Sequence, residues 1–322
     1  MALVGVFPGQ GSQYIGMGKD FYNNFAIAKD VYHEVDDVLN YKLSELIFNG
    51  TEEELKQTDK TQPALMATSI AIVRVLEAEC GLTTKHFRYL AGHSLGEYSA
   101  LCFAGAISLK DTALALQARG RAMMDASLNY KGSMLAIVGF TDEALDNLIK
   151  EALVKNPDSI LVKANDNANG QMVLSGSVAA AEYAAQNAKA FGIKMAVAIP
   201  VSGAFHSPHM QAATSKMQEF LDSITINTPV VPVIQNYNAM PVSEPLQIKQ
   251  NLIKQIEGSV KWRQTMMFCE QNGITNLVEI GAKNVLCGLC KRTAPSIVPT
   301  SIEKVENINL IQSIIEQIKN EA

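Results

Sequence analysis

Hydrophobic and polar positions along the chain form two kinds of pattern. Short apolar runs rich in β-branched and aromatic residues predict strands, and longer stretches with apolar residues at intervals of three and four predict helices. In the N-terminal part the pattern predicts strands at Leu3–Phe7 and Phe87–Ala91, a polar helical stretch through about Leu55, and helices at Gln62–Cys80, Leu95–Ala104 and Leu109–Ser127. Strands that alternate with helices are typical of a layered α/β fold.

The segment from about residue 130 to 198 follows an order of its own. It predicts strands at Ser133–Val138, Ile160–Ala164, Met172–Ser175 and Lys194–Ile199, a polar loop at Asn165–Gly170, and helices at Thr141–Val154 and Val178–Phe191. The order is β-α-β-β-α-β, which is that of a ferredoxin-like unit. We therefore expect residues 130–199 to form a small subdomain inserted into a large α/β catalytic domain with a parallel-sheet core, made of residues 1–129 and 200–322.

The large domain continues after this insert. Here the pattern predicts a helix at Pro208–Leu221 with Ser207 as its N-cap, a strand at Pro232–Gln235, a helix at Pro245–Ile256 and a strand at Asn276–Ile280. Proline is common at the first helical position, and serine is a favoured N-cap residue.

Composition narrows the class of protein. The 322 residues are 48% hydrophobic and 18% charged, which is enough apolar material for a core and excludes a disordered chain. Lys and Arg number 27 against 32 Asp and Glu, a net charge of −5, which argues against a protein built to bind nucleic acid or an anionic membrane. The most apolar segment, Ala64–Val75, contains Arg74 and is too short to cross a bilayer.

Five scattered cysteines suggest free thiols in a reducing compartment. The N-terminus carries no basic leader, and its apolar run stops at Pro8, so we expect no signal peptide. The expected location is the cytoplasm, or an organelle interior if a leader was removed. Cys287 and Cys290 form a single C-x-x-C, which we interpret as two small core residues one helical turn apart.

The strongest chemical signal is Gly92-His93-Ser94-Leu95-Gly96, which follows a predicted strand and opens a predicted helix. That context is what a nucleophile elbow requires. The glycines permit a tight turn, and the start of the helix favours negative charge that develops near Ser94. Ser94 is therefore the candidate nucleophile.

A serine nucleophile needs a base, and the chain has five histidines. His206 lies in a loop just before a predicted helix, which is a good place for a base. His93 is interpreted as packing beside the turn, with its side chain pointing away from that of Ser94, and His209 as structural. A metal site at His206 and His209 lacks further ligands nearby.

Arg119 follows apolar residues at helical spacing and is placed at the edge of the apolar face of its helix. A planar guanidinium at that position could receive a carboxylate in a two-pronged salt bridge. A solvated surface arginine is the alternative.

Four motifs occur in order along nearly the whole chain: Phe7-Pro8-Gly9-Gln10-Gly11-Ser12-Gln13, Gly92-His93-Ser94-Leu95-Gly96-Glu97, Gln117-Ala118-Arg119-Gly120 and Gly203-Ala204-Phe205-His206-Ser207. Together they resemble the motifs of the malonyl-CoA:acyl carrier protein transacylases, acyltransferases of fatty-acid and polyketide synthesis. The resemblance runs from Phe7 to about Arg292. It implies an α/β-hydrolase-like large domain with a ferredoxin-like insert.

The resemblance also implies a role for each site residue. Ser94 becomes a malonyl ester, and His206 is its base. The backbone N–H groups of Gln10 and Leu95 form the oxyanion hole. Arg119 binds the free malonyl carboxylate, and the main-chain carbonyl of Gln255 orients His206; no acid that would complete a three-residue triad is evident.

The implied reaction moves a malonyl group from malonyl-CoA to the phosphopantetheine thiol of acyl carrier protein, in fatty-acid biosynthesis and without a cofactor. Malonyl-CoA and acyl carrier protein are the expected partners, with no nucleic acid and no membrane. Phe205 beside the base fits an unbranched malonyl unit. The alternatives are a discrete acyltransferase of a polyketide synthase, a serine hydrolase or thioesterase, and an inactive acyltransferase-like binding module.

Overall fold

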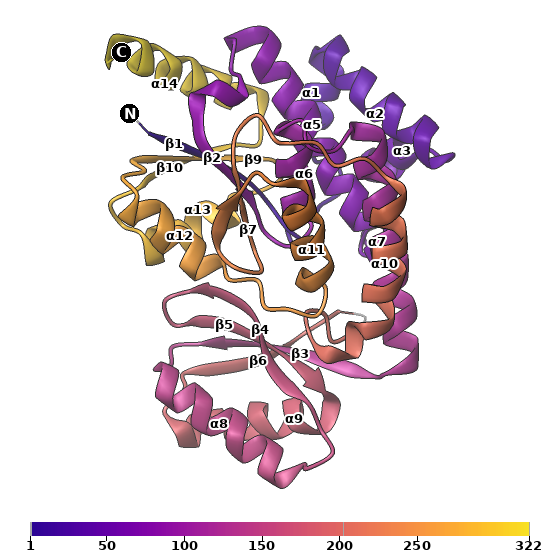
Figure 1. The fold of residues 1–322 in the computed structure, drawn as a ribbon, viewed down its shortest axis with the longest axis vertical. Helices are drawn as coiled ribbons and strands as arrows, with labels where there is room; N and C mark the ends of the chain where they lie inside the picture. The colour runs from indigo at the N-terminus through magenta and orange to yellow at the C-terminus, as the bar shows by residue number, and fades with distance from the viewer. Residues whose placement is uncertain (1, 202, 322) are drawn as a thin grey trace.

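A six-stranded sheet organises most of the chain (Figure 1). The computed structural model describes residues 2–201 and 203–321; Met1, Ser202 and Ala322, which the predicted domain ranges include, lie outside the described residues. The strands stand in the order β10 (Val298–Ile302), β9 (Asn276–Ile280), β1 (Leu3–Phe7), β2 (Phe87–Gly92), β7 (Val233–Gln235) and β8 (Met240–Val242). Neighbours pair in parallel from β10 to β7, and β8 is antiparallel to β7.

Strand β1 is buried along its whole length, because both faces of the sheet are covered. Leu3 and Phe7 point into the core made with the helices α5, α6 and α7, and Val4 and Val6 point into the core made with α12 and α13. Figure 1 shows these two helix groups on opposite sides of the sheet. The alternation follows from the two-residue period of a strand. These helices are α5 (Thr58–Cys80), α6 (Gly96–Phe103), α7 (Leu109–Asn129), α12 (Trp262–Gln271) and α13 (Val285–Thr293).

Further helices surround the sheet. They are α1 (Lys19–Asn24), α2 (Ala26–Leu39), α3 (Leu43–Asn49), α4 (Glu52–Leu55), α10 (Gln211–Ser223), α11 (Pro245–Gln255) and α14 (Ile308–Glu321), with short 3₁₀ turns η1 (Thr84–His86), η3 (Pro208–Met210) and η4 (Val305–Asn307). Over residues 2–201 and 203–321, no helix combines the length and hydropathy that a bilayer crossing requires.

Two helix starts differ from the prediction. Helix α5 begins at Thr58 rather than Gln62, because its polar first turn is buried against α7, where a side chain at Gly120 would lie 2.4 Å from the Cα of Asp59. The helix predicted from Pro208 begins as the 3₁₀ turn η3. Ser207 precedes it, but its hydroxyl donates to the carbonyl of Ala204 at 2.6 Å instead of capping the helix.

A second sheet is built from the middle of the chain. Its strands stand in the order β4-β5-β3-β6, all antiparallel to their neighbours. Its elements are β3 (Gly132–Val138), α8 (Asp142–Lys155), β4 (Leu161–Ala168), β5 (Gln171–Ser177), α9 (Val178–Asn187), η2 (Ala188–Phe191) and β6 (Met195–Ile199). The order β-α-β-β-α-β is the predicted one, and the predicted fold class, a parallel-sheet core with a ferredoxin-like unit, is confirmed.

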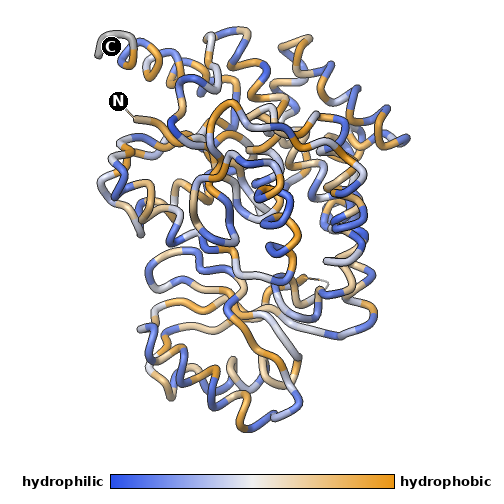
Figure 2. The backbone as a smooth tube through the Cα atoms, viewed as in Figure 1, coloured by the Kyte–Doolittle hydropathy of each residue, from blue (hydrophilic) through white to orange (hydrophobic). Residues whose placement is uncertain are grey.

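Helix α8 shows why this unit folds as it does. Along α8 the colour in Figure 2 changes repeatedly between hydrophilic and hydrophobic. Its buried residues Leu145, Leu148 and Ala152 recur at intervals of three and four, and they join a core with residues of β3 to β5. Thr141 caps the helix, since its hydroxyl accepts the N–H of Ala144 at 3.2 Å.

The predicted polar loop Asn165–Gly170 is wrong. Strand β4 continues through Ala168, and only Asn169 and Gly170 turn. The polar residues stay in the strand because the loop before α12 pairs with them: the N–H of Asp166 donates to the carbonyl of Val260 at 2.9 Å, and the N–H of Val260 donates to the carbonyl of Ala164 at 2.8 Å.

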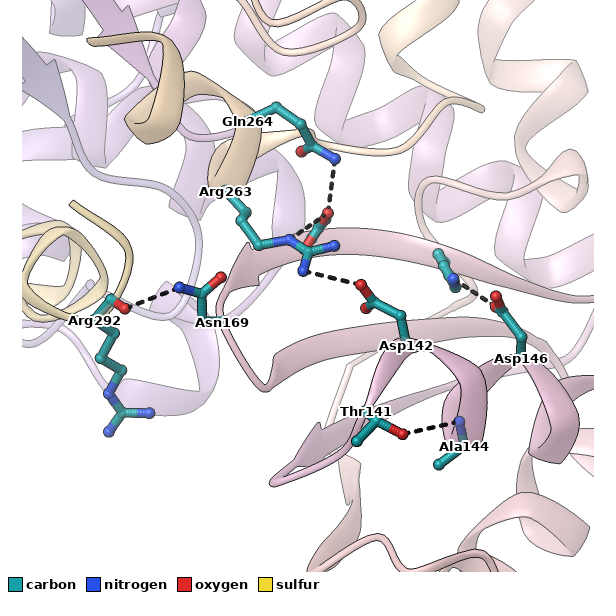
Figure 3. A network of polar contacts seen from close by, with 10 residues as sticks. Thr141, Asp142, Ala144, Asp146, Asn169, Arg263, Gln264 and Arg292 are labelled. Atoms are coloured by element: carbon teal, nitrogen blue, oxygen red, sulfur yellow. Dashed lines mark hydrogen bonds and ion pairs between the residues drawn. The ribbon is translucent and has the colours of Figure 1, made fainter. Parts of the chain in front are cut away.

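Charged side chains reinforce this junction between the second sheet and α12 (Figure 3). The Nε of Arg263 lies 2.8 Å from Oδ1 of buried Asp166, and its Nη1 lies 3.4 Å from Oδ2 of Asp142. Gln264 donates to Oδ2 of Asp166 at 2.8 Å. Beside them, the amide of Asn169 donates to the carbonyl of Arg292 at 3.3 Å. Residues of α12 and α13 thus hold one edge of the second sheet.

Candidate active site

Ser94 lies in a strained turn between β2 and α6. Its φ of 53° is left-handed. The flanking glycines are required by close backbone approach: a Cβ at Gly92 would lie 2.0 Å from the carbonyl of Gly96, and one at Gly96 would lie 2.3 Å from the carbonyl of Phe7. The N–H of Ser94 donates to Oδ1 of Asn236 at 2.7 Å, which holds the turn from the end of β7. This is the geometry of a nucleophile elbow.

His206 comes from the loop before η3 and faces Ser94. Its Nε2 lies 2.8 Å from the Ser94 Oγ. Its Nδ1 lies 2.8 Å from the carbonyl oxygen of Gln255 and 3.2 Å from that of Gly258. Carbonyls only accept, so Nδ1 carries the proton and the lone pair of Nε2 faces the serine hydroxyl.

The surroundings keep His206 neutral. The residue is 3% exposed, and burial, with a smaller contribution from the nearby Arg119 cation, lowers its pKa to about 3. A neutral imidazole with a free Nε2 is the form that can accept a proton from a serine.

Arg119 is a fully buried cation rather than a residue at the edge of an apolar face. It is 1% exposed, and its Nη2 lies 3.1 Å from the Ser94 Oγ. Its Nη1 donates to the amide oxygen of Gln62 at 2.8 Å, and its Nη2 donates to that of Gln255 at 2.9 Å. No carboxylate of the described residues pairs with it directly. A buried guanidinium whose hydrogen-bond partners here, two amides and a hydroxyl, are all neutral is suited to bind an anion.

A cavity of about 290 Å³ connects these groups, and its lining includes Ser94, His206, Arg119, Gln10 and Phe205. A larger groove of about 650 Å³ shares Gln10 with it and continues along α4. Within the described chain, neither the N–H of Gln10 nor that of Leu95 donates to another backbone group. The structure thus brings Ser94, His206, Arg119 and Gln10 to one cavity; Leu95 follows Ser94 in the chain, and Gln255 contacts His206 through its carbonyl.

Three residues of the site were missed from the sequence. Gln62 contacts Arg119, Asn236 holds Ser94, and Glu97 accepts hydrogen bonds from the groups around Ser94. A partial signal existed for two of them. Asn236 directly follows a predicted strand, and Glu97 is the one charged residue of α6, in its first turn.

His93 lines the cavity as well as packing beside the turn. Its ring lies 5.6 Å from that of Trp262, and its Nε2 lies 2.8 Å from Oδ1 of Asn167. Cys287 and Cys290 are buried free thiols one turn apart in α13. Over the part of the chain that the structure describes, no group of three His, Cys, Asp or Glu side chains could hold a metal ion.

Comparison with known proteins gives consistent matches. The model of the acyl transferase domain family matches residues 4–320. Malonyl CoA-acyl carrier protein transacylase of Bacillus subtilis is 40% identical over 98% of each chain, and that of Haemophilus influenzae is 36% identical over 96% of this chain and 98% of its own.

Solved structures of similar proteins also cover nearly the whole chain. An acyl-carrier-protein-S-malonyltransferase from Bartonella henselae superposes with a TM-score of 0.94 at 41% identity, covering 98% of this chain and 100% of its own. A malonyl-transacylase in complex with a type II polyketide synthase acyl-carrier protein superposes with a TM-score of 0.92 at 35% identity over the same shares.

Proposed function

Since the chain belongs to the acyl transferase family, among its malonyl CoA-acyl carrier protein transacylases, we propose that it is an [acyl-carrier-protein] S-malonyltransferase of fatty-acid biosynthesis. It moves a malonyl group from malonyl-CoA to the phosphopantetheine thiol of acyl carrier protein. One observation carries the proposal: the Ser94 hydroxyl lies 2.8 Å from the neutral imidazole of His206 and 3.1 Å from the buried cation of Arg119.

In the first half-reaction, His206 Nε2 takes the proton of Ser94 as Oγ attacks the thioester carbonyl. The backbone N–H groups of Gln10 and Leu95 donate to the oxyanion of the tetrahedral intermediate; a donor of this kind typically contributes about 10²–10³ in rate. The C–S bond then breaks, and His206 returns the proton to the sulfur of CoA. The product is a malonyl ester of Ser94.

The second half-reaction runs the same steps with the carrier thiol. His206 takes the thiol proton, the sulfur attacks the ester carbonyl, and the C–O bond breaks as Ser94 regains its proton. The main-chain carbonyl of Gln255 keeps the Nδ1 proton of His206 in place through both steps. Because a thioester is exchanged for a thioester, the reaction is nearly balanced and needs no cofactor.

Arg119 selects the substrate. The malonyl carboxylate accepts from the guanidinium in place of neutral amide partners, and acetyl-CoA has no group to do so. With acetyl-CoA the guanidinium keeps its amide partners, so we expect discrimination below the factor of about 10⁴ that is typical of sites whose buried polar group is left unpaired. Phe205, which lines the cavity, favours an unbranched unit.

The proposal extends to partners, location and domain limits. Lys283 lines the groove that adjoins the cavity, and it can contribute to the docking of an acidic carrier. Five free thiols support a cytoplasmic location. Pairing of β3 with β5 and β6 supports the division into residues 130–199 and residues 1–129 with 200–322.

Mass spectrometry after incubation with malonyl-CoA tests the function. We expect a malonyl mass on the peptide that contains Ser94, and its transfer to added holo-carrier protein. The Ser94→Ala variant, which keeps the cavity but lacks the hydroxyl, serves as the control. Absence of the label, or release of malonate faster than transfer, would refute the transferase and favour a hydrolase.

A discrete acyltransferase of a polyketide synthase is the second candidate, because one matching structure is a transacylase bound to a polyketide carrier protein. A panel of carrier proteins separates the two. Faster malonyl transfer to a fatty-acid carrier supports the first proposal, and faster transfer to a polyketide carrier supports the second.

A further inference from the structure

Glu97 is a buried carboxylate to which the reaction described above assigns no step. It lies in the first turn of α6, three residues after Ser94, and is 0% exposed. Burial raises its pKa to about 7, despite hydrogen bonds and the Arg119 cation, which favour the charged form. Burying a carboxylate is costly, so its retention beside the nucleophile calls for a reason.

Among the described residues, the hydrogen-bond partners of the Glu97 carboxylate are all donors. Its Oε1 accepts from Nε2 of Gln235 at 3.1 Å, and its Oε2 accepts from the N–H of Asn236 at 2.8 Å and from Nε2 of Gln255 at 2.9 Å. The amide of Gln235 cannot reverse freely, because its Oε1 accepts from Asn251 at 2.6 Å. Three donors thus converge on one carboxylate, which in its ionised form only accepts, and their hydrogen bonds favour that form.

Gln255 links this group to the reacting atoms. The Nε2 of Gln255 donates both to Glu97 and, at 3.0 Å, to the carbonyl of Ser94. Its Oε1 therefore faces Arg119 and accepts from Nη2 at 2.9 Å. The main-chain carbonyl of the same residue accepts from His206 at 2.8 Å. One residue therefore contacts Ser94, Arg119 and His206.

We propose that Glu97 is a positioning residue for malonyl selection: its carboxylate fixes the orientation of the Gln255 amide, and this amide holds the guanidinium of Arg119 where the malonyl carboxylate binds. The inference rests on the proposed function. The role requires a carboxylate, because both of its oxygens must accept hydrogen bonds if the donors of Gln235, Asn236 and Gln255 are all to be paired.

An amide at position 97 breaks this arrangement. In the Glu97→Gln variant one of the two terminal atoms becomes a donor and faces at least one of the converging donors. In the position of Oε1 this donor faces Nε2 of Gln235, which Asn251 holds, and in the position of Oε2 it faces Nε2 of Gln255. Gln255 relieves the second conflict by reversing its amide, which turns its NH₂ toward the Arg119 guanidinium, itself donor-only. Arg119 then shifts away from the carboxylate position.

The test compares malonyl-CoA and acetyl-CoA loading of Ser94 by mass spectrometry, for wild type and variants. For Glu97→Gln we expect kcat/KM for malonyl loading to fall about 10²-fold, as a misplacement of about 1 Å can cost, and acetyl loading to fall much less. A matched control is Glu279→Gln. Glu279 is also 0% exposed with a pKa raised to about 7, but it accepts from the N–H groups of Leu286 and Cys287 at the start of α13. Its variant should keep the malonyl preference.

A double-mutant cycle with Gln255→Met separates a role through Gln255 from a general effect on the fold. This substitution removes the side-chain amide and leaves the main-chain carbonyl for His206. If Glu97 acts through Gln255, the double variant loses no more than Gln255→Met alone. Losses that multiply, or an unchanged malonyl preference in Glu97→Gln, overturn the proposal.

Two other results are possible: the variant does not fold, or the wild-type protein does not load malonyl. If Glu97→Gln does not fold, as judged by thermal unfolding, Glu97→Asp, whose carboxylate is one methylene shorter, takes its place: loss of the malonyl preference supports the proposal and its retention overturns it. If the wild-type protein does not load malonyl at all, the proposed function fails, and that result is distinct from a wild type that loads and a variant that is unaffected.

Discussion

Removing the buried guanidinium is the most informative single perturbation of the site. Arg119→Ala deletes a cation that donates to Gln62, Gln255 and the Ser94 hydroxyl. The two amide oxygens then lose a donor, and the cavity loses its positive charge. We expect the enzyme to lose its preference for malonyl-CoA while it keeps the Ser94–His206 pair.

The size of the effect follows from the bonds that the substrate carboxylate would lose. A hydrogen bond to a charged group contributes about 1.5–3 kcal/mol, and a planar guanidinium donates two to a carboxylate. A loss of about 3–6 kcal/mol corresponds to a fall of about 10²–10⁴ in kcat/KM, since about 1.4 kcal/mol is tenfold. Acetyl-CoA has no distal carboxylate and forms neither hydrogen bond with Arg119, so the rate of its loading should change far less.

The assay measures the rate of ester formation on Ser94 with each acyl-CoA, together with a pH series. Arg119 also lowers the pKa of His206, so its removal raises that pKa, and the loss of activity on acidification should move to higher pH. Arg119→Lys is the matched control: it restores a charge without the planar pair of donors, and should recover only part of the malonyl rate.

Equal losses for malonyl and acetyl loading would refute the reasoning, since they would show that Arg119 serves the fold or the nucleophile rather than the distal carboxylate. Thermal unfolding of the variant identifies a loss that comes from the fold.

The geometry supports three other predictions. Because burial lowers the pKa of His206 to about 3, loading should vary little between about pH 8 and about pH 5; a decline centred on the ordinary value of 6.5 would contradict this. Between pH 6.5 and about pH 3, His206 is protonated in the unfolded state but not in the folded state. The free energy of unfolding should therefore be unaffected by this residue above pH 6.5 and should fall as the pH is lowered from 6.5 toward 3. Gly92→Ala would place its Cβ 2.0 Å from the carbonyl of Gly96 and should lower the free energy of unfolding by about 1–3 kcal/mol in urea titrations. Gly288→Ala is its control in α13, where only the neighbouring backbone of its own helix lies within 4 Å of the added carbon. It should stabilise by about 0.4–1 kcal/mol, and equal effects of the two would show that the elbow tolerates a side chain.

Local patterns were enough to predict the elements that carry the nucleophile. Strand β1 was predicted with its observed bounds, and β2 and α6 within one residue at each end. These elements are mostly apolar, and a glycine lies at or within two residues of the end of each, so their limits can be predicted from the local sequence. The family resemblance added Gln10, Leu95 and Gln255, for which no local pattern exists.

The errors lie where distant partners decide the structure. Asn165 and Asp166 are polar, and a polar run indicates a loop; they form part of β4 because Val260 and Arg263, almost a hundred positions away, satisfy them. The same limit applies to Arg119. Spacing places it on a helix, but its burial depends on Gln62 and Gln255, which come from two other helices.

The junction at Asp166 constrains how sequences of this family recombine. A chimera that takes Gly132–Ile199 from a relative replaces Asp166 and Asp142 but leaves Arg263 and Gln264 in the parent. The strand limits are thus an incomplete guide to crossover points. A compatible exchange carries Trp262–Gln271 with the second sheet, so that each acidic residue keeps the helix that neutralises it.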